Sequence, residues 1–249
     1  MISPGRVAFN IGGIDIMWYG LLIGFAFLLA LVISYYRAPK LGIKKDHVLD
    51  IALVIFPCAI IGARLYYVIF SWDMYKDNLS EIFNTRSGGL AIHGGLILSF
   101  IGVFILCKFI KENYLDVIDL IAPVIALGQA IGRWGNFFNE EAHGRLTDSS
   151  LAVIINGQSY YPTFLYESVW CFALFLFLLY LTKHRQFRGQ IVCLYGMLYS
   201  VERFFVESLR TDSLMIGPLR QAQVISIAIF AFCLILYIIL KKKKQRRYK

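Results

Sequence analysis

Charged residues are scarce in this sequence: they make up 16% of its 249 positions, whereas about 25% is usual in a soluble domain. Apolar residues reach 58%, too many for a folded chain to cover its surface with polar groups in water. The sequence also lacks the basic region and small-residue cleavage site of a signal peptide, so we expect the first apolar run to stay in the mature chain. This composition excludes a disordered chain, a collagen, a coiled coil and an ordinary cytosolic enzyme, and it indicates a membrane protein.

Cysteine pairs of the kind that bind metals are also missing. All five cysteines lie within apolar runs, and no two have CxxC spacing or a histidine at ligand spacing. Each therefore fits a small buried hydrophobic residue. The sequence indicates neither a metal site nor a disulfide framework.

The net charge of +9 does not have the pattern of a nucleic-acid-binding surface. Seven of the 25 basic residues occupy positions 241–249, and the other 240 residues carry only +2. A Lys/Arg cluster just beyond an apolar run is typical of a cytoplasmic flank at anionic lipid. We therefore expect no nucleic-acid partner and a cytoplasmic C-terminus.

Seven apolar runs approach the length of about 20 residues that a transmembrane helix needs. They occupy residues 17–36, 48–70, 90–109, 117–131, 163–181, 190–205 and 221–240. The fourth run is the shortest and contains Pro123. We keep it as a span, because without it the loops rich in Lys and Arg would no longer all fall on the same side of the membrane. The sequence thus predicts an all-α integral membrane protein with about seven transmembrane helices in a single polytopic domain, residues 1–249.

Loop charge predicts the orientation of these spans. With the C-terminus inside, the cytoplasmic segments hold 16 Lys and Arg residues, against eight on the other side. This excess follows the positive-inside rule and places the N-terminus outside. The two longest polar segments, 71–88 and 133–162, then lie on the outer side, and function is expected there.

Ionisable residues within the spans are the candidate functional residues, because each is costly in a bilayer unless it is paired or hydrated. His93 is followed by Gly94 and Gly95, which predict a close approach of two backbones or a broken turn. The imidazole can take a proton near neutral pH, or it can simply be held by a neighbouring carbonyl group.

The densest polar run covers residues 132–145, where the fourth span is expected to end. It interleaves glycines with two arginines, two amides, two carboxylates and three aromatic residues. A guanidinium can bind phosphate oxygens through two N–H groups, and aromatic rings settle at the depth of lipid headgroups. An interfacial loop with ordinary snorkelling arginines would explain the charges but not the many glycines and amides.

Further polar residues lie in other spans. Arg203 and Glu207 are four residues apart, so they can pair on one face of a helix. Arg64 lies in the second span, Tyr19 also fits an aromatic belt, and Glu167 is a candidate counter-charge for Arg64. Arginines near the outer leaflet select an anionic ligand, most simply a phospholipid headgroup, and nearby histidine and carboxylate groups allow proton transfer.

Two other classes of protein compete with an enzyme. A carrier or flippase for an anionic lipid would also need arginines and broken helices, but the sequence shows no paired half-helices in two repeats. A non-catalytic assembly factor would leave the segments around His93 and Arg133 without explanation.

The run at 132–145 resembles the signature of the prolipoprotein diacylglyceryl transferase family of bacterial membrane enzymes. The signature is G-R-x-G-N-F-x-N-x-E followed by G-R, and it is matched by residues 132–141 with Gly144 and Arg145. Other family elements follow in the family's order along nearly the whole chain: Trp18-Tyr19-Gly20, His93-Gly94-Gly95, Pro162-Thr163, Tyr166-Glu167 and Arg203 to Arg210.

The resemblance implies transfer of the diacylglyceryl group of phosphatidylglycerol to the thiol of the lipobox cysteine in a preprolipoprotein. A thioether forms and glycerol 1-phosphate leaves, in the first step of lipoprotein maturation. The nucleophile belongs to the substrate, so none of the five cysteines needs to be catalytic. The resemblance implies no metal and no cofactor, and it implies a multi-pass location in the bacterial cytoplasmic membrane with the active site toward the outer leaflet.

The same resemblance implies roles for single residues. Arg133 and Arg203 would stabilise the leaving phosphate, and His93 would deprotonate the thiol. Glu141 is the alternative base, or else it orients an arginine. The candidate catalytic residues are His93, Arg133, Arg203 and Glu141, and the candidate substrate-binding residues are Arg133, Asn136, Tyr19, Asn139, Gly144, Glu207 and Arg64. The expected partners are phosphatidylglycerol and the signal peptide of the preprolipoprotein, and the chain is expected to be a monomer.

Overall fold

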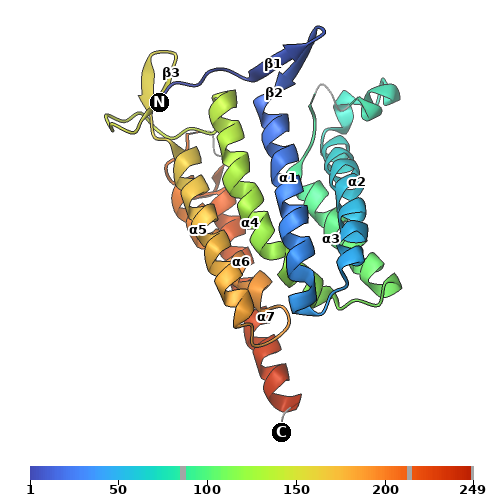
Figure 1. Cartoon of the computed structure of the whole chain (residues 1–249). Coiled ribbons are helices and arrows are strands. Elements are labelled where there is room, and N and C mark those ends of the chain that lie inside the picture. The colour runs from blue at the N-terminus through green and yellow to red at the C-terminus, as the bar shows by residue number, and fades with distance from the viewer. Residues whose placement is uncertain (85–87, 212–214, 248–249) are drawn as a thin grey trace. The chain divides into compact units, whose positions relative to one another are not determined.

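A computed structural model of the chain describes residues 1–84, 88–211 and 215–247. Residues 85–87 of the predicted polar segment 71–88, and the last two residues of the basic tail, lie outside the described residues. The described part forms seven long helices and three short antiparallel hairpins (Figure 1). It divides into two compact units, Met1–Ser34 with Ile118–Lys249, and Tyr35–Val117.

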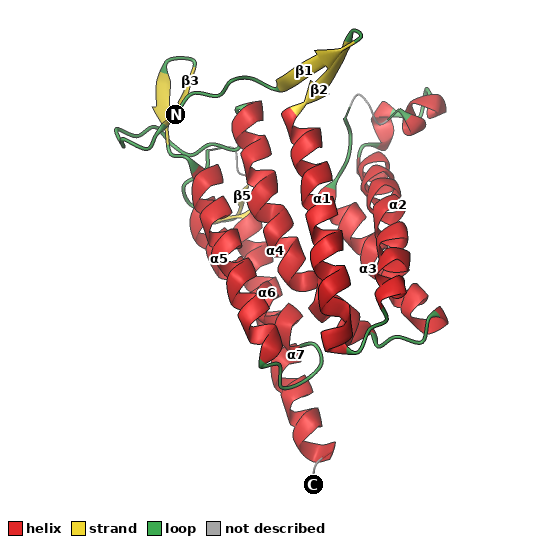
Figure 2. Ribbon diagram, in the orientation of Figure 1, coloured by secondary structure: helices red, strands yellow, loops and turns green. Residues whose placement is uncertain are grey.

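The first unit contains all three hairpins, which are the yellow arrows of Figure 2. Two of its helices, the first and the fourth of the chain, continue for a few residues into the second unit. In chain order its elements are β1 (Val7–Ile11), β2 (Ile14–Met17), α1 (Trp18–Arg37), α4 (Tyr114–Asn139), β3 (Val153–Ile155), β4 (Gln158–Tyr160), α5 (Thr163–Lys183), α6 (Gln190–Glu207), β5 (Met215–Ile216), β6 (Leu219–Arg220) and α7 (Gln221–Arg247).

The second unit is built on two helices that pack at very short distance. Its elements are η1 (Ala38–Leu41), α2 (Lys45–Phe70), η2 (Trp72–Met74), η3 (Leu79–Phe83) and α3 (Ile92–Phe109). A Cβ atom on Gly94 would overlap the backbone of Gly62, and one on Gly62 would overlap the backbone of Gly94. Small residues let helices approach closely in a bilayer, where no hydrophobic effect drives them together. The prediction of close backbone approach at Gly94 is confirmed, and α3 is continuous there.

Each of the seven predicted spans corresponds to one helix, so the prediction of an all-α membrane protein is confirmed. Among the described residues, six helices (α1 to α5 and α7) are long and apolar enough to cross a membrane. The remaining long helix, α6, is more polar because Glu202, Arg203 and Glu207 lie near its end.

Helix α4 is longer than the sequence suggested. It continues to Asn139, whereas the predicted span ended at residue 131. A helix satisfies its own backbone groups, which favours its continuation at membrane depth even through Gly132 and Gly135. The residues of the signature up to Asn139 therefore lie on the last turns of a helix and not in a loop.

The core of the first unit joins α4 to α5 and α6. Its buried members are Ala122, Ala126, Leu127, Leu174, Phe175, Leu178 and Ile191. Asp119 of α4 is fully buried, and its carboxylate accepts hydrogen bonds from the backbone N–H groups of Gly189 (2.8 Å) and Val192 (2.9 Å) at the start of α6. These bonds satisfy N–H groups that the first turn of a helix leaves unpaired, and they fix the start of α6 against α4.

Candidate active site

One buried carboxylate, that of Glu167 on α5, joins three helices of the first unit. Its side chain is 1% exposed, and it forms ion pairs with Arg133 of α4 and with Arg203 of α6. Arg203 Nη1 lies 3.3 Å from Glu167 Oε1 and 3.4 Å from Oε2, while Arg133 Nη2 contacts Oε2. The sequence suggested Glu167 as a counter-charge for Arg64, but its partners in the structure are these two arginines.

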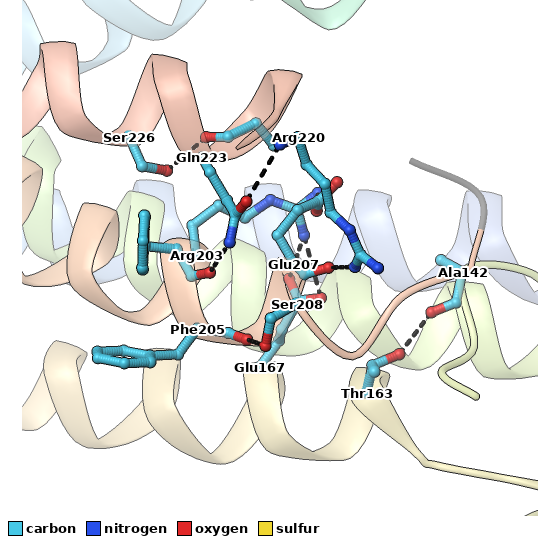
Figure 3. A network of polar contacts seen from close by, with 12 residues as sticks. Ala142, Thr163, Glu167, Arg203, Phe205, Glu207, Ser208, Arg220, Gln223 and Ser226 are labelled. Atoms are coloured by element: carbon cyan, nitrogen blue, oxygen red, sulfur yellow. Dashed lines mark hydrogen bonds and ion pairs between the residues drawn. The ribbon is translucent and has the colours of Figure 1, made fainter. Parts of the chain in front are cut away.

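Arg203 also holds a second carboxylate on its own helix. Its Nη2 atom lies 2.6 Å from Oε2 of Glu207, which confirms the pairing predicted from their spacing. The guanidinium of Arg220, at the end of β6, donates a hydrogen bond to the backbone carbonyl of Glu207 (Figure 3). The backbone N–H of Arg220 in turn donates to Gln223 Oε1 at 3.1 Å. We call Arg133, Glu167, Arg203, Glu207 and Arg220 the arginine cluster.

The arginine cluster is suited to binding an oxyanion. Arg133 and Arg203 are held at a shared carboxylate, so their positions are fixed before any ligand arrives. Each guanidinium has five N–H donors in a planar fork that matches phosphate and carboxylate oxygens. Preorganised donors of this kind stabilise negative charge that develops on a leaving group.

The signature residues extend the cluster beyond Arg133. Arg133 Nη1 donates to Asn136 Oδ1 at 3.4 Å, and Asn136 Nδ2 donates to Glu141 Oε1 at 2.9 Å. Asn139 Nδ2 donates to the same oxygen of Glu141 at 3.2 Å. The two amides and the exposed carboxylate thus form a chain that begins at a guanidinium of the cluster.

The turn that carries Glu141 is strained. Glu140 and Ala142, which flank it, both have φ of 56°, in the left-handed region that residues with a side chain seldom adopt. The turn is held by the backbone N–H of Glu141, which donates to the carbonyl of Asn136 at 3.0 Å, and by Thr163 Oγ1, which donates to the carbonyl of Ala142. Backbone strain of this kind is concentrated at functional sites.

Gly144 lies where two segments meet. Its N–H donates to the carbonyl of Tyr161 at 2.9 Å, and it forms an isolated antiparallel bridge with Arg210. A Cβ atom on Gly144 would overlap the side chain of Tyr161. The structure therefore places Gly144 as a packing point between the end of α6 and the start of α5.

Tyr19 lies against the end of α4, which carries the signature residues. A Cβ atom on Gly135 would overlap the ring of Tyr19, so the glycine provides the space that the ring occupies. Next to it, the rings of Trp18 and Phe138 are stacked with centroids 4.8 Å apart. The start of α1 is thereby fitted onto the end of α4, and Tyr19 remains 43% exposed.

Two predicted site residues, Arg64 and His93, belong to the second unit. All five N–H groups of Arg64 face backbone carbonyl groups, and its side chain is buried. These carbonyls belong to Glu81, Ile82, Asn84, Gly88 and Gly89. The guanidinium also lies over the ring of Tyr75, with its carbon 5.0 Å from the ring centroid. Arg64 thus fixes residues 81–84 and 88–89, which lie between α2 and α3, by hydrogen bonds to their backbone.

His93 lies in the first turn of α3 and is exposed. The centroid of its ring is 6.2 Å from that of Tyr66 on α2. The exposure of the imidazole is compatible with the predicted role of a base.

The sequence did not indicate the part that Arg220 and Glu202 play in the site. Glu202 is 5% exposed, and neither of its carboxylate oxygens has a hydrogen-bond partner among the described residues. An acidic residue one position before Arg203, within an apolar span, was the available signal. Within the described ranges, no group of three or more His, Cys, Asp or Glu side chains is arranged to hold a metal ion.

The chain is similar to known proteins over nearly its whole length. Residues 6–239 match the family described as prolipoprotein diacylglyceryl transferase. The chain is similar to proteins named phosphatidylglycerol–prolipoprotein diacylglyceryl transferase from Clostridioides difficile (strain 630), with 48% identity over 96% of this chain and 97% of the relative, and from Finegoldia magna, with 52% identity over 96% of each. A relative of the same name from Clostridium botulinum (strain Loch Maree / Type A3) is 46% identical over 96% of this chain and 98% of its own length. The chain therefore belongs to the prolipoprotein diacylglyceryl transferase family.

Proposed function

We propose that this protein transfers the diacylglyceryl group of phosphatidylglycerol to the lipobox cysteine of a preprolipoprotein. The observation that carries this proposal is the pair of arginines, Arg133 and Arg203, held at the shared buried carboxylate of Glu167 within a chain of this family. The relatives are named for the same lipid and the same protein substrate.

The reaction is a displacement at carbon. The substrate thiolate attacks the carbon of the diacylglyceryl group that bears the phosphate. An S–C bond forms, and the bond between this carbon and the phosphate oxygen breaks. The bonding electrons leave with glycerol 1-phosphate, and the thiol proton passes to a base. The protein must therefore stabilise a leaving phosphate and remove one proton.

Arg133 and Arg203 perform the first task in this proposal. Their contacts with Glu167, Glu207 and Asn136 use only part of their N–H groups, and the remaining ones bind phosphate oxygens. Glu207 contacts Arg203, and Asn136 contacts Arg133. Each guanidinium therefore keeps one orientation while charge builds on the leaving group.

His93 performs the second task. Its imidazole is exposed, so a ring nitrogen is accessible to accept the thiol proton. Glu141 is better suited to orienting than to accepting this proton, because its Oε1 already accepts hydrogen bonds from Asn136 and Asn139. Asn136 and Tyr19 contact the lipid in this proposal; it is supported by the hydrogen bond of Asn136 to Glu141 and by the ring of Tyr19 lying next to Gly135.

We place the protein in the bacterial cytoplasmic membrane, with its N-terminus and active site outside and its basic tail in the cytoplasm. The excess of Lys and Arg in the predicted inner segments supports this orientation. Arg133, Glu167 and Arg203 lie near the end of α4, the start of α5 and the end of α6, respectively. The same prediction assigns these three helix ends to the outer side.

The test is a single-turnover assay with the purified protein in detergent, phosphatidylglycerol and a lipobox peptide. We expect the peptide to gain the mass of one diacylglyceryl group in a bond that resists hydroxylamine, as a thioether does. A peptide with serine in place of the cysteine should gain nothing, and phosphatidylethanolamine should not replace the lipid. Lipid binding without any adduct would point to a carrier and contradict the proposal.

A further inference from the structure

Arg220 is the arginine of the cluster to which the proposed reaction gives no task. Its guanidinium donates a hydrogen bond to the backbone carbonyl of Glu207, and among the described residues it contacts no carboxylate (Figure 3). The other two arginines of the cluster each contact at least one carboxylate. Arg220 is therefore a cation without a counter-charge in the part of the chain that the structure describes.

The main chain at Arg220 is fixed independently of its guanidinium. Arg220 pairs with Met215 in the β5–β6 hairpin, and its backbone N–H donates to Gln223 Oε1 at 3.1 Å. The side chain of Gln223 is buried, and its Nε2 donates to the carbonyl of Phe204 on α6 at 3.3 Å. These contacts hold the start of α7 against α6. Most of the five N–H groups of the guanidinium have no acceptor among the described residues, so they are available to a ligand.

Arg220 lies at the depth where lipid phosphates are found. The next 20 residues, 221–240, contain no Asp, Glu, His, Lys or Arg, and they form the apolar part of α7. At a rise of about 1.5 Å per residue this part is about 30 Å long, which is the thickness of the hydrocarbon core of a bilayer. Lys241 follows this apolar part and Arg220 precedes it, so the two residues mark its opposite boundaries with the headgroups.

A cation of this kind favours an anionic headgroup over a zwitterionic one. In phosphatidylglycerol nothing in the headgroup balances the charge of the phosphate, whereas in phosphatidylethanolamine an ammonium group does. A guanidinium without a counter-charge therefore gains more from the first lipid than from the second. Arg203 and Arg220 both contact Glu207, one at its carboxylate and the other at its backbone carbonyl, so the two guanidiniums lie around one residue.

We propose that Arg220 binds the phosphodiester of the lipid before the reaction and selects an anionic headgroup over a zwitterionic one. Arg220 then contributes to the affinity for the lipid, whereas Arg133 and Arg203 also act on the charge that develops on the leaving phosphate. This inference rests on the proposed function for the identity of the lipid, which is phosphatidylglycerol.

The test is calorimetric titration of the purified protein in detergent with short-chain phosphatidylglycerol and, separately, with short-chain phosphatidylethanolamine. Arg220→Gln should bind phosphatidylglycerol about tenfold to a hundredfold more weakly, which is what a hydrogen bond between charged groups contributes. Its affinity for phosphatidylethanolamine should change much less, so the preference between the lipids falls. Arg220→Lys keeps the charge and should retain most of this preference. In the peptide assay, Arg220→Gln should raise KM for the lipid and leave kcat nearly unchanged.

Arg6→Gln is the matched control, because Arg6 is an exposed arginine outside the cluster that also donates to a backbone carbonyl, that of Asn139. It should leave both affinities unchanged. Equal affinity of the unaltered protein for the two lipids would overturn the inference without recourse to any variant. An unchanged affinity of Arg220→Gln for phosphatidylglycerol, an equal loss for both lipids, or a lower kcat at unchanged KM would also overturn it. If the lipids bind as expected but no peptide adduct forms, the proposed function fails and the role of Arg220 stands.

Discussion

Arg203 on α6 lies beside both oxygens of Glu167 on α5, with Nη1 at 3.3 Å from Oε1 and 3.4 Å from Oε2. Arg133 of α4 reaches the same carboxylate, so one acid fixes two guanidiniums from two other helices. Glu167 is consequently the residue on which the geometry of the cluster depends most.

Glu167→Gln should therefore impair both stability and activity. The variant keeps the shape of the side chain but leaves two partly buried cations without their shared counter-charge, which should cost about 3 kcal/mol of unfolding free energy. Misplacement of the two guanidiniums should lower the transfer rate about a hundredfold. Thermal unfolding in detergent and the lipobox-peptide assay measure the two effects. Glu140→Gln, at an exposed position, should change neither, and an active Glu167→Gln would show that the arginines hold their places without it.

Arg133→Lys should lower kcat/KM for phosphatidylglycerol about a hundredfold or more, although the charge is kept. A lysine ammonium cannot contact Glu167, Asn136 and a phosphate in one plane, as the guanidinium can. The gain in mass of the peptide measures the rate. Arg6→Lys is the control, since this exposed arginine donates to the backbone carbonyl of Asn139, which an ammonium can also reach. Near-normal transfer by Arg133→Lys would exclude bidentate binding by this residue.

His93→Gln should lower the rate at saturating lipid about a hundredfold or more, because a general base typically contributes that much. The variant should also have a different pH profile of the transfer rate, because a general base exchanges a proton during the reaction. A pH series of single-turnover rates measures both. Retained activity with an unchanged pH profile would assign His93 a structural role and move the search for the base to Glu141.

Two glycines of α4 provide a matched pair of variants. Gly135→Ala should displace the ring of Tyr19, because its Cβ would overlap that ring, and transfer should fall about tenfold or more. Gly128→Ala on the same helix meets nothing within 4 Å, so it should keep full activity and raise the stability by up to about 1 kcal/mol. Transfer rate and thermal unfolding distinguish them. Equal activity of the two variants would show that the position of Tyr19 does not matter.

Arg64→Lys should act on the connection between α2 and α3. The guanidinium serves five carbonyl groups in residues 81–89, and an ammonium with three donors cannot satisfy them all. We expect faster hydrogen exchange of the amides in residues 79–84, measured by mass spectrometry. Lys76→Ala, which removes an exposed ion pair with Asp73, should leave exchange nearly unchanged. A variant that raises KM for the lipid but leaves exchange unaltered would instead favour the predicted role of Arg64 in substrate binding.

Much of the fold was determined by the sequence alone. In a bilayer each helix must satisfy its own backbone groups, so a run of apolar residues is enough to predict a helix, and all seven were found. The pairing of Arg203 with Glu207 was equally predictable, because residues four apart lie on one helical face whatever surrounds the helix. The close approach at Gly94 followed from the absence of side chains there.

Only the tertiary structure decided which charges meet. Glu167 and Arg203 are 36 residues apart, and their contact depends on how α5 and α6 are rotated against each other, which no local spacing encodes. The same holds for Arg64, whose partners are carbonyl groups that every sequence possesses, and for Glu202, whose isolation results from the packing around it. The sequence determined the helices and their polar residues because those signals are local, whereas helix packing decided the partners because a side-chain contact depends on the rotation and depth of both helices.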